Sequence, residues 1–153
     1  GRLFWTPEPG AALEERAADG APIPVEAPGE TRALRTAPPD NAALRVVASK
    51  SHRDAETDAF IARFRVADLL SAGSSLKFCL VASGEADLYP RFGPTMEWDT
   101  AAADAVLRAA GGRVDRADAV GGADGALRYG KADLRNPAFV AYAAGVAVAG
   151  EGA

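Results

Sequence analysis

This chain of 153 residues carries 17 basic and 21 acidic side chains, which gives a formal net charge of −4. It has no basic excess, which argues against binding to polymeric nucleic acid. Hydrophobic residues make up 48% of the chain, enough to bury a core, and the longest uncharged run, 136–150, is too short and too broken to cross a bilayer. Cys79 is the single cysteine, which is typical of a reducing cytoplasm, and its spacing from Leu76 and Leu80 indicates a buried structural thiol.

The first 40 residues predict short edge strands joined by turns. Seven of the ten prolines lie here, and Asp19-Gly20 between short apolar runs is a hairpin signal. We expect strands over Arg2–Thr6 and Pro22–Val25, an acidic, Ala-rich excursion between them, and a linker at Pro38-Pro39. We expect no secretion signal within these residues, and the start at Gly1, inside an expected strand, suggests a fragment or a processed chain.

Beyond residue 40 the hydrophobic pattern alternates between strands and helices, which predicts a layered α/β domain. The expected strands are Leu44–Ser49, Val66–Ser71, Asp87–Pro90 and Pro137–Tyr142, and the expected helices are Asp54–Phe64, Ser74–Ser83 and Trp98–Ala110. Gly111-Gly112 ends the last helix. We therefore divide the chain into residues 1–40, an α/β domain over 41–145, and a small-residue-rich tail over 146–153 that we expect to be frayed.

Asp99 is the first candidate for a metal ligand. It follows Trp98 at the opening of an Ala-rich helix, where unpaired N–H groups and a partial positive charge hold a carboxylate in its ionised form. Mg2+ requires that form. The alternative is an ordinary capped helix, in which Asp99 serves only the backbone. We expect the nearby Glu97 to be a solvated charge and Trp98 to pack in the core.

Lys77 is the only charged residue in the segment Leu69–Ser83, and two interpretations of it remain open. A lysine in a buried segment can extend its ammonium to water while its stem stays covered. Alternatively, Gly73, Ser74 and Ser75 open a helix whose N–H groups and hydroxyls cradle phosphate, with Lys77 adding charge.

Arg91 and His52 are further candidates for substrate contacts. Arg91 follows Tyr89-Pro90 where a strand ends, so its guanidinium fork can bind a second phosphate, although surface arginines are common. His52 is the only histidine and precedes a helix that Ser51 or Asp54 caps. It is either an exposed side chain without a role or a substrate contact, and we do not assign it as a general base.

Four motifs together resemble a known enzyme family. They are Ser49-Lys50-Ser51-His52, Ala72–Cys79, Ala86–Glu97 and the run 98–112 that begins with Trp98-Asp99. The last motif resembles the C-terminal signature of the inositol monophosphatase superfamily of Mg2+-dependent phosphatases, with Ala103 where the family usually has Gly. Their order and spacing, from about Leu44 to Val140, are similar to those of the bacterial 3'(2'),5'-bisphosphate nucleotidases, the CysQ-type branch.

The resemblance implies a layered αβ sandwich of the inositol monophosphatase type. This chain would be mainly its C-terminal α/β domain, and residues 1–40 would be a remnant of the preceding antiparallel sheet and a linker. The implied cofactor is Mg2+, with Asp99 as a ligand beside the substrate, Gly73 and Trp98 as structural support, and Lys50 in place of a family Arg. The residues that the resemblance assigns to substrate binding are His52, Ser74, Ser75, Lys77, Arg91 and Asp99.

The implied activity is removal of the 3'-phosphate of adenosine 3',5'-bisphosphate, and of its sulfated form, in sulfate assimilation or nucleotide salvage. The superfamily's other metal ligands lie in a Glu-Glu pair and an Asp-Pro-Leu/Ile-Asp-Gly-Thr segment. Neither motif is recognised here, so we expect the catalytic site to be incomplete and the chain to be inactive without a missing N-terminal portion of the same protein. The alternatives are an inositol or sugar-phosphate phosphatase of the same superfamily and a catalytically dead remnant. The resemblance also implies a cytoplasmic location, with membrane contact at most peripheral on the inner face.

Overall fold

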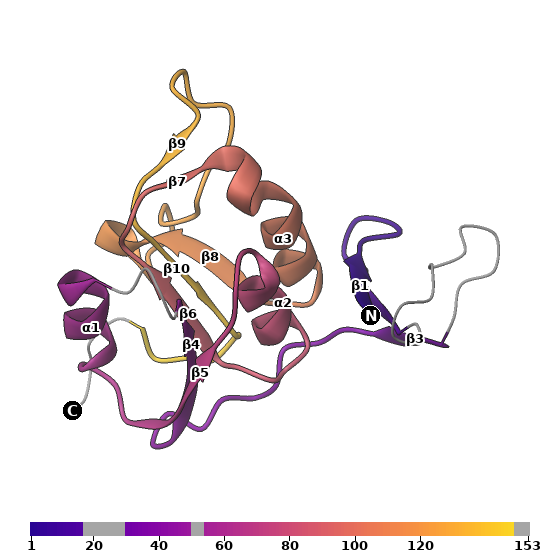
Figure 1. Ribbon diagram of the computed structural model, residues 1–153, viewed down its shortest axis with the longest axis horizontal. Coiled ribbons are helices and arrows are strands. Elements are labelled where there is room, and N and C mark those ends of the chain that lie inside the picture. The colour runs from indigo at the N-terminus through magenta and orange to yellow at the C-terminus, as the bar shows by residue number, and fades with distance from the viewer. Residues whose placement is uncertain (17–29, 50–53, 149–153) are drawn as a thin grey trace.

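The computed structural model describes residues 1–16, 30–49 and 54–148. A small antiparallel sheet is formed by β1 (Arg2–Trp5), β2 (Leu13–Arg16) and β3 (Glu30–Ala33), in that order. It stands beside the larger part of the molecule (Figure 1). The expected strand Pro22–Val25 and the Asp19-Gly20 turn lie outside the described residues. Within the expected acidic, Ala-rich excursion, residues Leu13–Arg16 form the strand β2, which was not predicted and which pairs on both sides, with β1 and with β3.

A five-stranded sheet forms the centre of the larger part and confirms the predicted α/β fold. Its strands are β4 (Leu44–Ala48), β5 (Val66–Ser71), β6 (Leu88–Arg91), β8 (Arg113–Arg116) and β10 (Phe139–Tyr142). The order is β5-β4-β6-β10-β8. β4 pairs in parallel with β5 and β6, whereas β10 runs antiparallel to β6 and β8. The strand β8 was not predicted from the sequence.

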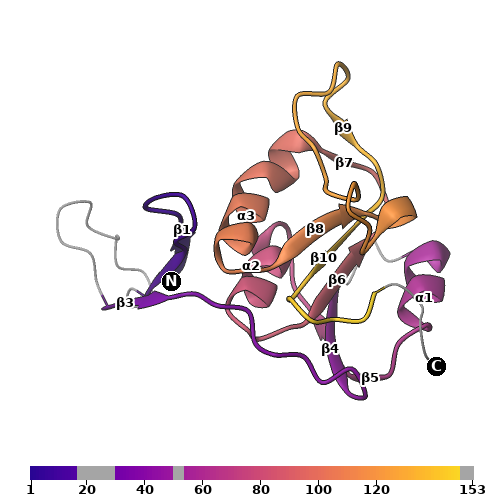
Figure 2. The same cartoon turned by 180° about the vertical axis from the view of Figure 1, so that it is seen from behind.

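Three helices cover the two faces of this sheet. They are α1 (Ala55–Ile61), α2 (Leu76–Ala82) and α3 (Glu97–Ala109). α2 and α3 pack against each other on one face and α1 lies on the opposite face (Figures 1 and 2). The carboxylate of Asp54 accepts the Thr57 N–H at 2.8 Å and caps α1, which resolves the choice of cap. In the described part of the chain, none of the helices has the length and apolar character needed to cross a bilayer.

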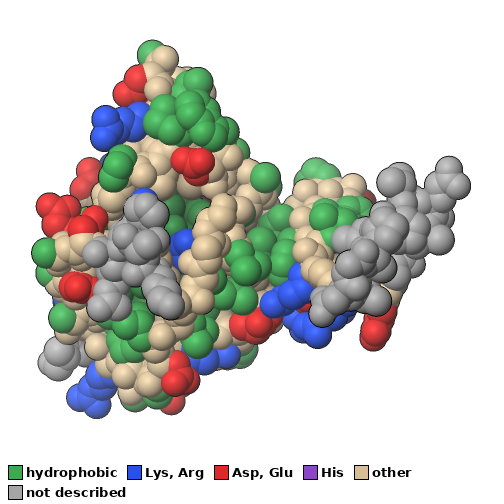
Figure 3. Space-filling model, viewed as in Figure 1, with side chains coloured by type: hydrophobic (Ala, Val, Ile, Leu, Met, Phe, Trp, Pro, Cys, Tyr) green, Lys and Arg blue, Asp and Glu red, His purple; other side chains and the backbone are tan. Residues whose placement is uncertain are grey.

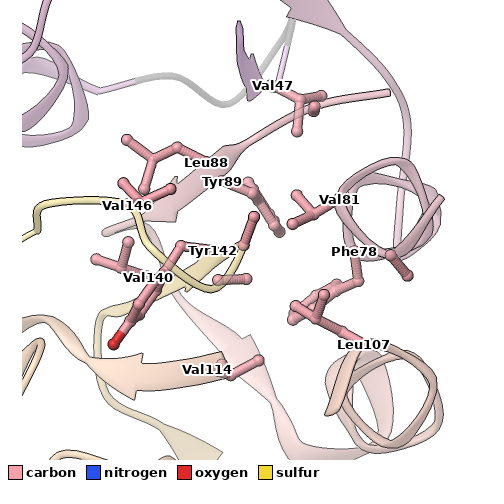
Figure 4. Close-up of a cluster of buried hydrophobic side chains, with 14 of the residues drawn as sticks. Val47, Phe78, Val81, Leu88, Tyr89, Leu107, Val114, Val140, Tyr142 and Val146 are labelled. Atoms are coloured by element: carbon pink, nitrogen blue, oxygen red, sulfur yellow. The ribbon is translucent and has the colours of Figure 1, made fainter. Parts of the chain in front are cut away.

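The core lies between the sheet and the pair α2 and α3. Figure 4 shows Phe78, Val81 and Leu107 from these helices among the side chains of the strands. The Phe78 ring is 5.5 Å from the Phe139 ring, centroid to centroid, and meets Tyr89 edge to face at 5.2 Å. Cys79 is buried as predicted, and burial raises the pKa of its thiol to about 11.

Two shorter elements and the last turns of the chain complete the fold. A ribbon of β7 (Thr95–Met96) and β9 (Arg135–Asn136) adjoins the start of α3, and the 3-10 turn η1 (Ala117–Ala119) follows β8. Val146 and Val148 are buried, and the Asn41 side chain donates to the Gly145 carbonyl at 3.0 Å. The expectation of a frayed tail is therefore wrong up to Val148, while residues 149–153 lie outside the described residues.

The small sheet is fastened to the larger part by backbone and ionic contacts. The Thr36 N–H, shortly after β3, donates to the Ala110 carbonyl at the end of α3 at 3.0 Å. Arg2 pairs with Glu85, in the loop after α2, at 2.5 Å. Arg2 also pairs with the fully buried Glu14, as do Arg16 and Arg32 on the same sheet, where Figure 3 shows a group of blue side chains.

Candidate functional site

A cavity of about 390 Å³ opens where the end of β6 meets the first turns of α2 and α3. Five of the residues that the sequence analysis selected lie in its wall, although they are distributed over 26 positions of the chain, from 74 to 99. His52 lies outside the described residues, so its assignment stays a prediction. The cavity is lined by Ser49, Ser74, Ser75, Lys77, Phe78, Tyr89, Arg91, Pro94, Thr95, Asp99 and Thr100.

Lys77 is buried, with only 4% of its surface exposed. Its ammonium donates to the carbonyl oxygens of Ser74 at 2.8 Å and Ala72 at 3.2 Å, and lies 5.1 Å from the centroid of the Tyr89 ring. The interpretation that Lys77 extends into water is therefore wrong. An ammonium has three N–H groups, and two of them have partners among the described residues, which leaves one for a ligand in the cavity.

The surroundings of Lys77 make its charged form less favourable than it would be in water. Burial, and then the charge of Arg91, lower the pKa of the Lys77 ammonium. An anion in the cavity would oppose both causes, because it restores electrostatic stabilisation to the ammonium and screens it from Arg91. The electrostatics of this wall therefore favour an anionic ligand.

The loop before α2 contributes two serines, Ser74 and Ser75, to the wall of the cavity. α2 begins later than predicted, with Ser75 as the residue that precedes its first turn, and Ser74 has a positive φ of 48°. This backbone conformation is uncommon for a residue other than glycine. A Cβ at Gly73 would meet nothing within 4 Å, so no close packing requires glycine there, and its supporting role stays a prediction.

Arg91 lies at the end of β6 beside the start of α1. Its terminal nitrogen lies 3.4 Å from the Pro94 carbonyl oxygen. A Cβ at Gly93 would lie 3.3 Å from the Arg91 guanidinium carbon and 3.4 Å from a carboxylate oxygen of Asp54. Glycine at position 93 thus leaves room for a guanidinium that is closely packed and faces the same cavity as Lys77.

Asp99 is exposed and occupies the third position of α3. One of its carboxylate oxygens accepts the Met96 N–H at 2.8 Å, which satisfies a donor at the helix start. The capping role is therefore present, and Asp99 also lines the cavity. Across the described ranges 1–16, 30–49 and 54–148, no group of three His, Cys, Asp or Glu side chains lies close enough to hold a metal ion. As a metal ligand Asp99 stays a prediction.

The two neighbours of Asp99 differ from expectation. Trp98 is 66% exposed, so it does not pack in the core. Ala103, Val106 and Leu107 form the buried stripe of α3, and Trp98 lies off that stripe. Glu97 is only 8% exposed and is not a solvated charge, because it accepts two backbone N–H groups and pairs with Lys131.

The expectation that the chain has no Glu-Glu pair is wrong, because Glu14 and Glu15 are adjacent. Glu14 lies on β2 and pairs with three arginines, Arg2, Arg16 and Arg32. A carboxylate bound in this way stabilises the small sheet. The pair therefore offers no support for a metal site.

Some cavity residues were missed from the sequence. Ser49, Tyr89, Thr95 and Thr100 carry hydroxyls and lie within or beside the quoted motifs. Burial raises the pKa of Tyr89 to about 12. The available signal was their position at or near the ends of the predicted strands and helices, where side chains reach the end of a sheet.

Comparison with known proteins agrees with this geometry. Residues 9–147 match the inositol monophosphatase family. The chain belongs to this family. It is 58% identical over 69 residues to the 3'(2'),5'-bisphosphate nucleotidase CysQ of Escherichia coli, an alignment that covers 45% of this chain and 28% of the relative. It is 49% identical over 89 residues to an "uncharacterized protein in pss 5'region" of Rhizobium leguminosarum, covering 54% and 88%.

The fold is also similar to a solved structure. The crystal structure of CysQ from Bacteroides thetaiotaomicron matches with a TM-score of 0.71 and 37% identity, covering 93% of this chain and 54% of that protein. This chain thus spans about half the length of that structure and less than a third of the E. coli relative is aligned with it. The family resemblance predicted from the four motifs is confirmed.

Proposed function

We propose that this chain supplies the nucleotide-binding half of a Mg2+-dependent phosphatase that removes the 3'-phosphate of adenosine 3',5'-bisphosphate, or of its sulfated form. The observation that carries the proposal is the position of Lys77, buried in the wall of a cavity that Arg91 and Asp99 also line. The printed activity of the CysQ relative, a 3'(2'),5'-bisphosphate nucleotidase, supports the same substrate class.

Lys77, Arg91 and two serines of the cavity wall can bind the phosphate that is not cleaved. Two N–H groups of Lys77 bind described carbonyls, so the third can donate to a phosphate oxygen, and Arg91 can offer a planar fork of donors. The Ser74 and Ser75 hydroxyls line the same wall and can donate to further oxygens. These groups would hold the 5'-phosphate and so direct the 3'-phosphate toward Asp99.

Asp99 fits Mg2+ as one donor among several. Mg2+ is usually bound by one or two carboxylates, with waters and substrate phosphate completing the octahedron. When bound, Mg2+ would activate water and neutralise charge on the leaving oxygen. The role of Asp99 in this proposal is to bind the cation and keep it beside the substrate phosphate.

We propose that the remaining ligands lie in the part of such a protein that this chain does not span, since the chain covers 54% of the similar CysQ structure. We therefore propose that residues 1–40 are part of the neighbouring antiparallel-sheet domain, that 41–145 form the C-terminal α/β domain, and that the partner of this chain is the other half of the same protein. The Trp98 side chain, which is 66% exposed, is available for contact with that half.

Titration calorimetry on this chain tests the substrate class, with adenosine 3',5'-bisphosphate, AMP and inositol 1-phosphate as ligands. We expect the bisphosphate to bind most tightly, with amide shifts in NMR spectra concentrated at Ser74, Ser75, Lys77 and Arg91. Equal affinity for inositol 1-phosphate would favour the inositol-phosphatase alternative. No binding of any ligand at these residues would contradict the proposal and favour the remnant.

A further inference from the structure

The loop that precedes β9 is anchored on the first turn of α3 by a single carboxylate. Glu97 accepts the Gly130 N–H at 2.9 Å and the Lys131 N–H at 3.0 Å, and pairs with the Lys131 ammonium at 2.5 Å. In return, the Glu97 N–H donates to the Leu134 carbonyl at 2.8 Å. Leu134 has a positive φ of 55°, a conformation that a leucine keeps only where its surroundings hold it.

A second buried side chain holds the same turn from β9. The Asn136 side-chain nitrogen lies 2.9 Å from the Met96 carbonyl oxygen and 3.0 Å from the Thr100 hydroxyl. Its side-chain oxygen accepts from the Lys131 ammonium at 3.2 Å, so Asn136 and Glu97 share this lysine. Both side chains are buried, which makes these hydrogen bonds costly to break.

Met96 connects this network to Asp99. Its carbonyl is bound by Asn136, and its N–H donates to the Asp99 carboxylate at 2.8 Å. Successive helix residues are rotated by about 100°, so Glu97 and Asp99 leave the helix in different directions. Glu97 binds the loop at Gly130, while Asp99 lines the cavity.

We infer that Glu97 is a positioning residue of this site, which sets the orientation of the Asp99 carboxylate by fastening the loop 128–134 and Asn136 to the first turn of α3. The inference deepens the proposed function and rests on it, since the group that is oriented is the proposed metal ligand. Glu97 does not line the cavity, so it acts on the site through the loop and through Asp99 and not by touching a ligand.

The test compares Glu97→Ala and Glu97→Gln with Asp87→Asn in this chain. Asp87 is a matched control, because it is a buried carboxylate that also accepts a backbone N–H and pairs with a cation, both of Arg45, but it precedes β6 at the far end from Arg91. Two readouts are followed by NMR: hydrogen exchange of the Gly130, Lys131 and Met96 amides, and broadening of first-turn signals by Mn2+, which takes the same oxygen ligands as Mg2+.

In Glu97→Ala we expect exchange of all three amides to accelerate about tenfold or more relative to amides of β10, one lost hydrogen bond being worth about that factor. Mn2+ broadening at Asp99 should weaken in Glu97→Ala. Glu97→Gln keeps one acceptor, so both the faster exchange and the weaker broadening should be smaller in that variant. Asp87→Asn should leave both unchanged. If Glu97→Ala does not fold, Glu97→Gln alone carries the test, with smaller effects of the same sign.

Faster exchange at Gly130 and Lys131, with the Met96 amide and the Mn2+ broadening as in the wild type, would overturn the inference and leave Glu97 as a loop anchor only. If Mn2+ fails to broaden the Asp99 turn in the wild-type chain, Asp99 alone does not hold a cation without the ligands that this chain does not span. The Met96 exchange rate still decides between positioning and loop anchoring in that case.

Discussion

The ammonium of Lys77 lies 5.1 Å from the centre of the Tyr89 ring, on the wall of the cavity that Asp99 also lines. The Tyr89 ring is itself held edge to face against Phe78 and Phe139 in the core. A cation over a packed aromatic face is attracted to it and restricted in its motion. Lys77 is therefore held in place before any ligand arrives, which reduces the entropy cost of binding an anion.

We expect this chain by itself to show no appreciable turnover of adenosine 3',5'-bisphosphate with Mg2+. Asp99 is a single carboxylate, and no group of three possible ligands occurs among the residues described here. Phosphate release from the purified 153-residue chain measures this directly. Mg2+-dependent turnover that survives further purification would contradict the incomplete site.

In a full-length protein that contains this chain, Asp99→Asn should reduce kcat by orders of magnitude and leave the fold intact. The amide can still accept the Met96 N–H and cap α3, but it lacks the charge that binds a cation. Steady-state kinetics at saturating Mg2+, with the melting temperature as a control, check this outcome. Activity close to wild type would mean that Asp99 is a cap alone.

Glu14 should make the stability of the chain depend on acid pH. Burial raises the pKa of Glu14, but hydrogen bonds from Arg2, Arg32 and Arg16 outweigh it and lower the value from 4.5 to about 2. Because the folded-state pKa is depressed, the stabilisation is fully present above pH 4.5 and is lost as the pH falls toward 2. The loss should be roughly 1 to 3 kcal/mol, since the arginines are partly exposed and screened.

Urea unfolding of the wild type and of Glu14→Gln at several pH values isolates this contribution. The wild type should lose stability more steeply than the variant across this acid range, because glutamine does not titrate. Parallel curves would show that Glu14 has the same affinity for protons in the folded and unfolded chains.

Gly112→Ala should destabilise the fold by about 1 to 3 kcal/mol through overpacking. A Cβ at this position would overlap the Leu107 side chain and lie 3.0 Å from the Tyr142 carbonyl oxygen. Leu107 is fully buried and has little room to move. Gly73→Ala is the matched control and should change stability by less than about 0.5 kcal/mol. Equal stability of the two variants would show that the end of α3 can relax.

The strands and helices that follow a local pattern could be predicted from the sequence. Phe60 and Phe64 are one turn apart and their rings meet at 5.3 Å, although α1 ends at Ile61, three residues before the predicted end at Phe64. The strands β2 and β8 were missed because each carries charged residues, in Leu-Glu-Glu-Arg and Arg-Val-Asp-Arg. Their buried acids are paired by side chains from other strands, Arg32 with Glu14 and Tyr142 with Asp115, and local sequence does not report such partners.

The residues of the candidate site also differ in whether the sequence could predict them. Asp99, Lys77 and Arg91 could be selected because their motifs lie close together in the chain. The role of Glu97 could not, because its partners Gly130 and Lys131 lie 33 and 34 positions away. The exposure of Trp98 could have been predicted from the sequence, because the spacing of Ala103, Val106 and Leu107 indicates a buried helix face that does not include it.

The most direct test of the account is the affinity of Lys77→Met for adenosine 3',5'-bisphosphate. Methionine keeps the aliphatic stem and loses the donor to phosphate. Arg116→Met is the control for loss of one positive charge, because Arg116 pairs with the exposed Asp118 and does not line the cavity. Calorimetric titration and the melting temperature are measured for both variants.

We expect Lys77→Met to weaken binding of the bisphosphate about ten- to a hundredfold, the value of a charge-assisted hydrogen bond, with binding of inositol 1-phosphate little changed and Arg116→Met close to wild type. Bisphosphate affinity that is unchanged in a folded Lys77→Met variant, or reduced equally for both ligands, would contradict a second-phosphate site at Lys77.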